Sequence, residues 1–127
     1  MEEAISRKKI LVVDDEPNIR QLSRKILTKK FDVLEAEDGR QAIEIAGTQQ
    51  PDVILMDMMM PKMDGLTACY AIRNGTTTKS IPVVMVTAIG FDLNIKFSQQ
   101  MGANAYLTKP FNAKDLLDKI AQVISTS

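Results

Sequence analysis

The sequence contains no histidine and no tryptophan, and Cys69 is its only cysteine. A chain without histidine cannot build a Ser-His-Asp triad, bind zinc through imidazole or carry a phosphohistidine. A lone cysteine cannot form an internal disulfide, and it favours a reducing, cytoplasmic compartment. With 16 basic and 16 acidic side chains the formal net charge is zero, so we expect no direct binding of nucleic acid by a basic field over the whole domain.

Long apolar runs are also missing. None approaches the roughly 20 residues of a membrane-spanning helix, and residues 1–9 are polar and charged, without the apolar centre of a secretory signal. We therefore expect no membrane partner. The length of 127 residues and the hydrophobic share of 45% suit a single globular domain that needs no disulfide or structural metal. We expect this domain to occupy residues 1–127, with a core from about residue 8 to residue 124.

Short runs of consecutive apolar residues predict the strands. Residues 10–13, 53–56 and 83–86 are apolar without interruption and rich in β-branched side chains. A strand has this composition when both of its faces are covered, as in a parallel sheet. A weaker run at residues 105–107 predicts a further strand, and residues 31–36 have the composition of an edge strand.

Segments with helical spacing lie between these runs, and they predict five helices. Their apolar stripes are Ile19/Leu22/Ile26/Leu27, Ala42/Ile43/Ala46, Leu66/Cys69/Ile72, Ile95/Ser98/Met101 and Leu116/Leu117/Ile120/Val123/Ile124. Pro17, Asp64 and Asn112 are expected at helix starts, the last with Asp115 in a capping box. Five alternations of strand and helix predict an α/β fold. We expect a flavodoxin-like three-layer sandwich whose five-stranded parallel sheet has the order 2-1-3-4-5.

Polar side chains follow the predicted strands. Asp14 and Asp15 come directly after the first strand, Asp57 after the third, Thr87 after the fourth and Lys109 soon after the fifth. In an open α/β sheet, ligands bind at the carboxyl ends of the strands, where the strand order reverses. In the predicted order this point lies between the first and third strands. We therefore expect these side chains to share one crevice.

Three carboxylates in one crevice repel one another, by about 4 kcal/mol for two unit charges 4 Å apart at an effective dielectric of about 20. Either one carboxyl group keeps its proton or a cation neutralises the cluster. Only oxygen ligands are close by, and they suit Mg²⁺. Lys109 adds a positive charge and Thr87 a hydroxyl donor. The crevice is therefore suited to a phosphoryl group, which a carboxylate can accept as an acyl phosphate.

Four segments in this order resemble the receiver domain of two-component response regulators, the family of chemotaxis-type regulators. They are Asp14-Asp15, the segment DMMMPKMDG at residues 57–65, Val86-Thr87-Ala88 and Lys109-Pro110-Phe111. The similarity extends from about Lys8 to Val123. It implies that Asp57 is the phosphoacceptor, that Asp15 binds Mg²⁺ directly and that Asp14 binds it partly through water. The backbone carbonyl of Met59 is the remaining protein ligand that the resemblance implies.

The resemblance also implies a switch. Thr87 is expected to move to a phosphoryl oxygen, Lys109 to be its charge partner, and Tyr106 to change rotamer. A cis peptide bond between Lys109 and Pro110 is expected to aim the lysine. Met59 and Ile89 flank the acceptor at positions that influence water access in this family, and both are apolar here. We therefore predict slow self-hydrolysis of the phosphoaspartate.

The partners follow from the resemblance. The phosphoryl donor would be a sensor histidine kinase or a histidine phosphotransfer protein, because this chain has no histidine. A downstream protein or a fused output domain would meet the surface made by the fourth helix, fifth strand and fifth helix. The domain would be a signalling switch rather than an enzyme, although it would assist its own phosphorylation and dephosphorylation. Whether the receiver stands alone or belongs to a longer regulator, and whether phosphorylation produces a homodimer, stay open.

Each of these residues also has an interpretation without a functional role. Asp14 and Asp15 could cap the helix that Pro17 opens, and Asp57 could begin an ordinary loop. Thr87 could bond local backbone, and Lys109 could be a solvated surface charge. Tyr106 could merely pack, and residues 58–60, three methionines, are expected to fill the core and pack the loop rather than bind a metal.

Other functions fit the same residues less well. A phosphatase of the haloacid-dehalogenase type needs a second aspartate two residues after its nucleophile, where Met59 stands. A flavin site needs a hydroxyl- or glycine-rich phosphate loop after the first strand, and the acidic residues 14–16 would repel phosphate there. A glycine-rich P-loop motif is absent from the sequence. The phosphoacceptor interpretation is therefore favoured, with the phosphatase as the alternative.

Overall fold

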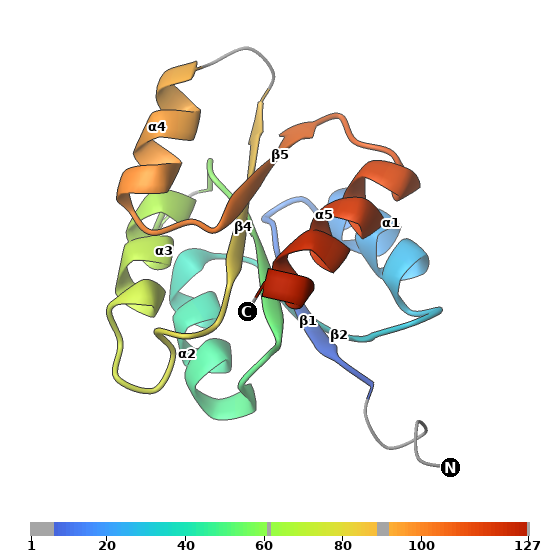
Figure 1. Cartoon of the computed structure of the whole chain (residues 1–127), viewed down its shortest axis with the longest axis horizontal. Helices are drawn as coiled ribbons and strands as arrows, with labels where there is room; N and C mark the ends of the chain where they lie inside the picture. The colour runs from blue at the N-terminus through green and yellow to red at the C-terminus, as the bar shows by residue number, and fades with distance from the viewer. Residues whose placement is uncertain (1–6, 61, 89–91, 127) are drawn as a thin grey trace.

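Strands and helices alternate along the chain in the computed structural model (Figure 1). The structure describes residues 7–60, 62–88 and 92–126. Its strands are β1 (Lys9–Val13), β2 (Asp32–Ala36), β3 (Val53–Asp57), β4 (Val83–Ala88) and β5 (Ala105–Lys109). Its helices are α1 (Pro17–Leu27), α2 (Gly39–Gln49), α3 (Gly65–Arg73), α4 (Asp92–Gln100) and α5 (Ala113–Thr126). Each predicted strand and helix is therefore confirmed.

The strands form one sheet in the order β2-β1-β3-β4-β5. All four neighbouring pairs are parallel, which confirms the predicted flavodoxin-like arrangement. Asp57 at the end of β3 pairs with Val86, and Thr87 on β4 pairs with Thr108. Since β1 ends at Val13, directly before Asp14, the carboxyl ends of the central strands meet at one edge of the sheet.

Side chains of the central strands alternate between two cores, one on each face of the sheet. Leu11 and Val13 of β1 pack in the core that α2 and α3 cover, whereas Ile10 and Val12 pack in the core beneath α1 and α5. Figure 1 shows α2, α3 and α4 on one face and α1 and α5 on the other. Because both faces are covered, all five residues of β3 are buried, and this explains the uninterrupted apolar runs.

The helices begin where their capping residues predicted. Asp64 accepts a hydrogen bond from the Thr67 amide at 2.8 Å at the start of α3. Asn112 accepts one from the Asp115 amide at 2.8 Å, and Asp115 accepts one from the Asn112 amide at 3.4 Å, which completes the predicted capping box. Pro17 is the first residue of α1. Within the described ranges, no helix is both long and apolar enough to cross a membrane.

Three details of the predicted packing were wrong. The apolar stripe of α1 predicts a buried Leu22, but this residue is 45% exposed, and Ser23 and Leu27 are the buried residues of this helix. The helix is rotated so that a serine faces the sheet. The run of three threonines at residues 76–78 predicts a surface loop, but Thr78 is buried, and its hydroxyl donates to the Ile72 carbonyl at 2.7 Å.

The third correction concerns the methionines after β3. Met58 is buried and Met60 packs against the core beneath α2 and α3, as expected of core and loop packing. Met59, however, is 73% exposed. An apolar side chain therefore lies at the surface directly beside the end of β3.

Candidate functional site

Three carboxylates converge at the carboxyl edge of the sheet. Asp14 and Asp15 follow β1, and Asp57 ends the neighbouring strand β3. One carboxylate oxygen from each residue lies within 4.8 Å of the others. Asp14 and Asp57 are buried, with 3% and 6% of their surface exposed, and Asp15 is exposed. The predicted crevice is therefore present, with two carboxylates inside it and one at its opening.

Lys109 reaches this cluster from the end of β5. Its Nζ donates a hydrogen bond to Oδ2 of Asp14 at 3.0 Å and lies 3.4 Å from Oδ1 of Asp57. A third carboxylate, Oε1 of Glu16, lies 3.7 Å away. The peptide bond between Lys109 and Pro110 is cis. The interpretation of Lys109 as a solvated surface charge is wrong, because its side chain is paired and only 24% exposed.

The electrostatics of the cluster show in the pKa of two groups. Burial, together with the charge of Asp14, raises the pKa of Asp57 from 3.8 to about 6, although Lys109 opposes this rise. Burial alone would lower the pKa of Lys109, but the hydrogen bond to Asp14 and the charge of Asp57 outweigh it, so this pKa is raised. Lys109 therefore stays charged, whereas Asp57 ionises close to neutral pH.

An open pocket of about 300 Å³ leads from solvent to Asp57. Its lining residues are Asp15, Glu16, Asp57, Met58, Met59, Val86 and Lys109. The loop after β3 is tightly fitted beside it. A side chain at Gly65 would come within 2.1 Å of the Asp57 carbonyl oxygen, so only glycine can begin α3 so close to the strand. Lys62 in the same loop has a left-handed backbone with φ of 68°.

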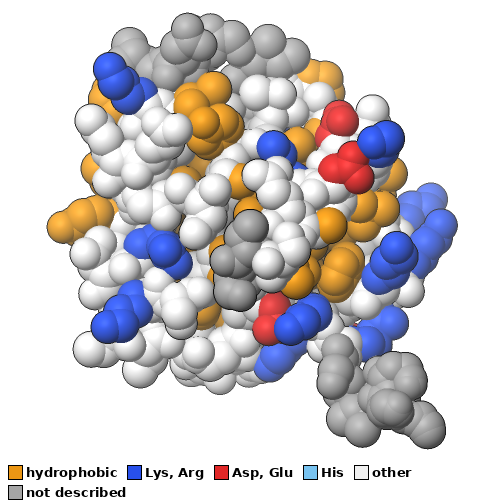
Figure 2. Space-filling view, in the orientation of Figure 1, with side chains coloured by type: hydrophobic (Ala, Val, Ile, Leu, Met, Phe, Trp, Pro, Cys, Tyr) orange, Lys and Arg blue, Asp and Glu red, His pale blue; other side chains and the backbone are white. Residues whose placement is uncertain are grey.

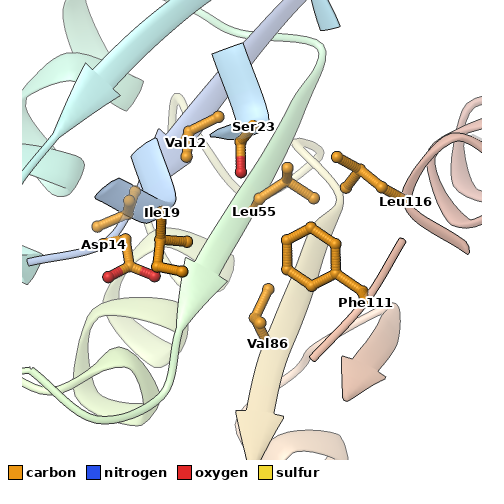
Figure 3. A pocket seen from close by; sticks show the side chains of 9 residues that line it. Val12, Asp14, Ile19, Ser23, Leu55, Val86, Phe111 and Leu116 are labelled. Atoms are coloured by element: carbon orange, nitrogen blue, oxygen red, sulfur yellow. The ribbon is translucent and has the colours of Figure 1, made fainter. Parts of the chain in front are cut away.

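A second cavity lies behind Asp14, between α1 and the sheet (Figure 3). Ser23, Leu55 and Phe111 are among its lining residues, and its volume is about 10 Å³. A cavity of this size holds about one water molecule. The larger pocket at Asp57 is therefore the one that can receive a phosphoryl group.

Not every predicted residue contacts the cluster. Thr87 is buried at the end of β4, but within the described part of the chain its hydroxyl forms no hydrogen bond with Asp57 or Lys109. Tyr106 lies on β5, where its Oη accepts a hydrogen bond from Nε2 of Gln99 at 3.1 Å. Ile89 lies outside the described residues. The backbone of Met59 borders the pocket.

The interpretation of Asp14 and Asp15 as helix caps is wrong. Glu16 occupies the N-cap position of α1, and its side chain makes no capping hydrogen bond. The carboxylate of Asp14 instead accepts a hydrogen bond from the Glu16 amide at 2.9 Å, which fixes the turn that enters the helix. Sequence reasoning assigned no role to Glu16 toward Lys109. The available signal was a third consecutive acid at a position where glutamate is a poor cap.

The fold and this site together define a receiver domain of the response-regulator type. Residues 10–121 match the family described as the response regulator receiver domain, and the chain belongs to this family. The resemblance noted from the sequence is thereby confirmed, and the phosphatase alternative is not favoured. The protein is a receiver domain of a signalling response regulator.

Relatives and solved structures agree with this assignment. The chain is 38% identical over 117 residues to the DNA-binding dual master transcriptional regulator RpaA of Synechocystis sp., covering 91% of this chain and 48% of that regulator. It is 36% identical to the alkaline phosphatase synthesis transcriptional regulatory protein PhoP of Bacillus subtilis, covering 94% of this chain and 50% of PhoP. The chain thus spans about half the length of these relatives.

A solved structure matches over nearly its whole length. The chemotaxis response regulator CheY4 of Vibrio cholerae superposes with a TM-score of 0.88 at 34% identity, covering 93% of this chain and 99% of CheY4. A putative response regulator from Chloroflexus aurantiacus superposes with a TM-score of 0.90 at 28% identity, covering 94% of this chain and 99% of that one. Both structures support the same fold.

Proposed function

We propose that Asp57 accepts a phosphoryl group from a phosphohistidine of a sensor histidine kinase or histidine phosphotransfer protein. The observation that carries the proposal is the convergence of three carboxylates within 4.8 Å beside the Nζ of Lys109. The donor imidazole must come from another protein, because this sequence contains no histidine. Asp57 is the acceptor because it lines the open pocket from the end of a fully buried strand.

The reaction is proposed to depend on Mg²⁺. The donor set is suited to this ion, since it consists of carboxylate oxygens with no histidine or thiol among them. Asp15 and Asp14 would hold it together with Asp57 and the backbone carbonyl of Met59. When bound, Mg²⁺ supplies positive charge that offsets the cluster and the transferring group. The excess of carboxylates over the single Lys109 ammonium favours such a cation.

The transfer itself needs an ionised Asp57. A carboxylate oxygen of Asp57 attacks phosphorus, and the new O–P bond forms as the P–N bond to the donor imidazole breaks. The electron pair of the broken bond stays on the imidazole nitrogen, which takes up a proton. Lys109 is already 3.4 Å from Oδ1 of Asp57, so its ammonium can pair with a phosphoryl oxygen bound there.

We propose that phosphorylation then switches a distant surface. A phosphoryl group adds negative charge and acceptor oxygens at the end of β3. The hydroxyl of Thr87, on the neighbouring strand β4, would move to one of these oxygens. Tyr106 would leave its hydrogen bond to Gln99, and this would change the surface of α4, β5 and α5.

The surface of α4, β5 and α5 has the composition of a partner-binding face. Figure 2 shows hydrophobic side chains at the surface beside α4 and β5 and charged side chains of both signs over α5. Phe97 on α4 is 43% exposed, and Lys114 and Asp118 form an exposed ion pair on α5. A downstream protein or an output domain of a longer regulator is the proposed partner. Residues 8–124 are proposed as the folded core of the receiver.

Intact mass after incubation with acetyl phosphate and Mg²⁺ tests the acceptor. The parent protein should gain one phosphoryl group, and Asp57→Asn should gain none. Asp118→Asn, which makes the same change on exposed α5, is the matched control and should be phosphorylated like the parent. Phosphorylation of Asp57→Asn at the parental rate, or none in the parent with Mg²⁺ present, would contradict the proposal.

A further inference from the structure

Glu16 lines the acceptor pocket, and its side chain does not cap the helix that follows it. It occupies the N-cap position of α1, where serine, threonine, aspartate and asparagine are preferred, and its carboxylate makes no capping hydrogen bond. Oε1 of Glu16 lies 3.7 Å from Nζ of Lys109, and the side chain is 63% exposed. A residue that departs from a local preference without a structural gain is a candidate for a functional role.

The charge of Glu16 acts on the mouth of the pocket rather than inside the carboxylate cluster. The group of carboxylates within 4.8 Å of one another consists of Asp14, Asp15 and Asp57. Glu16 lines the same pocket from outside this group. Its negative charge therefore faces any phosphodonor that enters toward Asp57.

We propose that Glu16 is a specificity-determining residue, whose carboxylate disfavours free anionic phosphodonors in proportion to their negative charge. This inference rests on the proposed function, because it concerns entry to Asp57. The charge of Glu16 would disfavour small acyl phosphates more than a phosphohistidine on a protein, because a protein donor can surround its phosphoryl group with positive charge. The occupant that Glu16 acts against is thus a small phosphorylated metabolite of the acyl phosphate class.

Two small donors with different charge provide the test. Acetyl phosphate is a dianion at pH 7.5; its P–O bond breaks, and acetate leaves with the electron pair. Phosphoramidate carries one net negative charge; its P–N bond breaks, and ammonia leaves. Both reactions form the same O–P bond to Asp57, so only the charge and the leaving group of the donor differ.

Glu16→Gln removes the charge and keeps the shape of the side chain. At saturating Mg²⁺ and low ionic strength we expect phosphorylation about threefold faster with phosphoramidate and about sevenfold faster with acetyl phosphate, from a charge roughly 7 Å away in a solvent-like dielectric. Both gains should shrink in 0.5 M salt, because salt screens exposed charges. Glu44→Gln is the matched control, since Glu44 is exposed on α2 and does not line the pocket. It changes the net charge equally and should leave both rates unchanged.

Magnesium affinity provides a readout that needs no phosphodonor. The charge that repels a dianion attracts a dication, so calorimetry should show weaker Mg²⁺ binding by Glu16→Gln, by about sevenfold at low ionic strength. Equal acceleration with both donors, no acceleration, the same effect in Glu44→Gln, or unchanged Mg²⁺ affinity would each overturn the inference. If the parent gains no phosphoryl group from either donor, both the proposed function and the role of Glu16 fail. If the parent is phosphorylated and Glu16→Gln matches it, only the role of Glu16 fails.

Discussion

The Nζ of Lys109 lies 3.4 Å from Oδ1 of Asp57, although a whole strand, β4, separates β5 from β3. The same ammonium donates to Asp14 at 3.0 Å. One cation thus bridges two buried carboxylates, yet it does not fully compensate them, because the pKa of Asp57 is still raised to about 6. Ionisation of Asp57 therefore destabilises the folded state. A bound cation, or a neutral side chain at this position, would remove this destabilisation.

Asp57→Asn should therefore stabilise the protein at neutral pH without divalent ions. A carboxyl group with a raised pKa in the folded state binds its proton more tightly there than in the unfolded chain. Its contribution to stability is thus greatest below pH 4 and falls as pH rises from about 4 to about 6. Above this window the loss corresponds to about 3 kcal/mol. Urea unfolding should show Asp57→Asn more stable than the parent by about 1–3 kcal/mol at pH 7.5.

The pH dependence of the stability difference tests whether the ionisation of Asp57 causes it. The stability difference between Asp57→Asn and the parent should become small at pH 4, where Asp57 is protonated in the folded protein. Addition of Mg²⁺ at pH 7.5 should stabilise the parent more than the variant, since ligand binding stabilises only the state that binds it. A difference that is constant from pH 4 to pH 7.5 would contradict the assignment to Asp57 ionisation.

The apolar surroundings of Asp57 predict a long-lived phosphoaspartate. Met59 lines the pocket and is 73% exposed, so it offers attacking water no polar partner. Replacement by a polar pair, Met59→Asn with Ile89→Glu, should speed loss of the phosphoryl group by a factor on the order of 10 or more, because polar groups can orient water and accept its proton. Radiolabelled or intact-mass decay curves measure this rate. Met59→Leu keeps the position apolar and should decay like the parent; a double variant that decays no faster refutes the idea.

The buried serine of α1 predicts a stabilising substitution. Ser23 is 2% exposed and faces the small cavity behind Asp14 (Figure 3). Alanine is the better helix former, and it fits the same buried position without a polar atom. Ser23→Ala should therefore raise the free energy of unfolding by about 0.5 kcal/mol, measured by urea unfolding.

Thr78→Ala is the counterpart of Ser23→Ala. The Thr78 hydroxyl is also buried, but it donates to the Ile72 carbonyl at 2.7 Å. Its removal should lower stability by about 1 kcal/mol or more. A Thr78→Ala variant with the urea midpoint of the parent would show that this hydrogen bond contributes nothing to stability.

The fold could be predicted from the sequence because its signals are local and repeated. Apolar runs marked strands covered on both faces, and the alternation with helical stripes left few topologies. The meeting of Asp14, Asp57 and Lys109 followed from their places at strand ends, since parallel strands bring these ends to one edge. The positions of side chains that depend on strand direction alone can therefore be predicted from the sequence.

The rest depends on tertiary packing that periodicity does not encode. The rotation of α1 about its axis decides that Ser23 faces the sheet and Leu22 does not, and a shift of one position along the stripe cannot be read from spacing alone. The contact of Glu16 with Lys109 arises from the path of two separate loops. The position of the Thr87 hydroxyl relative to Asp57 depends on side-chain conformation, which no sequence pattern specifies.

The thiol of Cys69 should be inert in the folded protein. Burial raises the pKa of Cys69 to about 11, so the reactive thiolate is scarce at neutral pH. The thiol belongs to α3 and is fully buried in the core between this helix and the sheet. Its reaction with a thiol reagent should therefore require unfolding, and the rate should follow the unfolded fraction as urea is added. A native protein that reacts at the rate of a free thiol would contradict this burial.

Lys62 in the loop after β3 predicts a second stabilising substitution. Its φ of 68° lies in the left-handed region, which costs a side chain with a Cβ about 1 kcal/mol or more and glycine nothing. Its contact with Asp38, at 3.9 Å and largely exposed, contributes little in return. Lys62→Gly should therefore raise the free energy of unfolding by about 0.5–1 kcal/mol. Lys119→Gly, in the regular helix α5, is the matched control and should lower it by about 1 kcal/mol. Equal destabilisation by both changes in urea titrations would show that the left-handed backbone at residue 62 carries no strain.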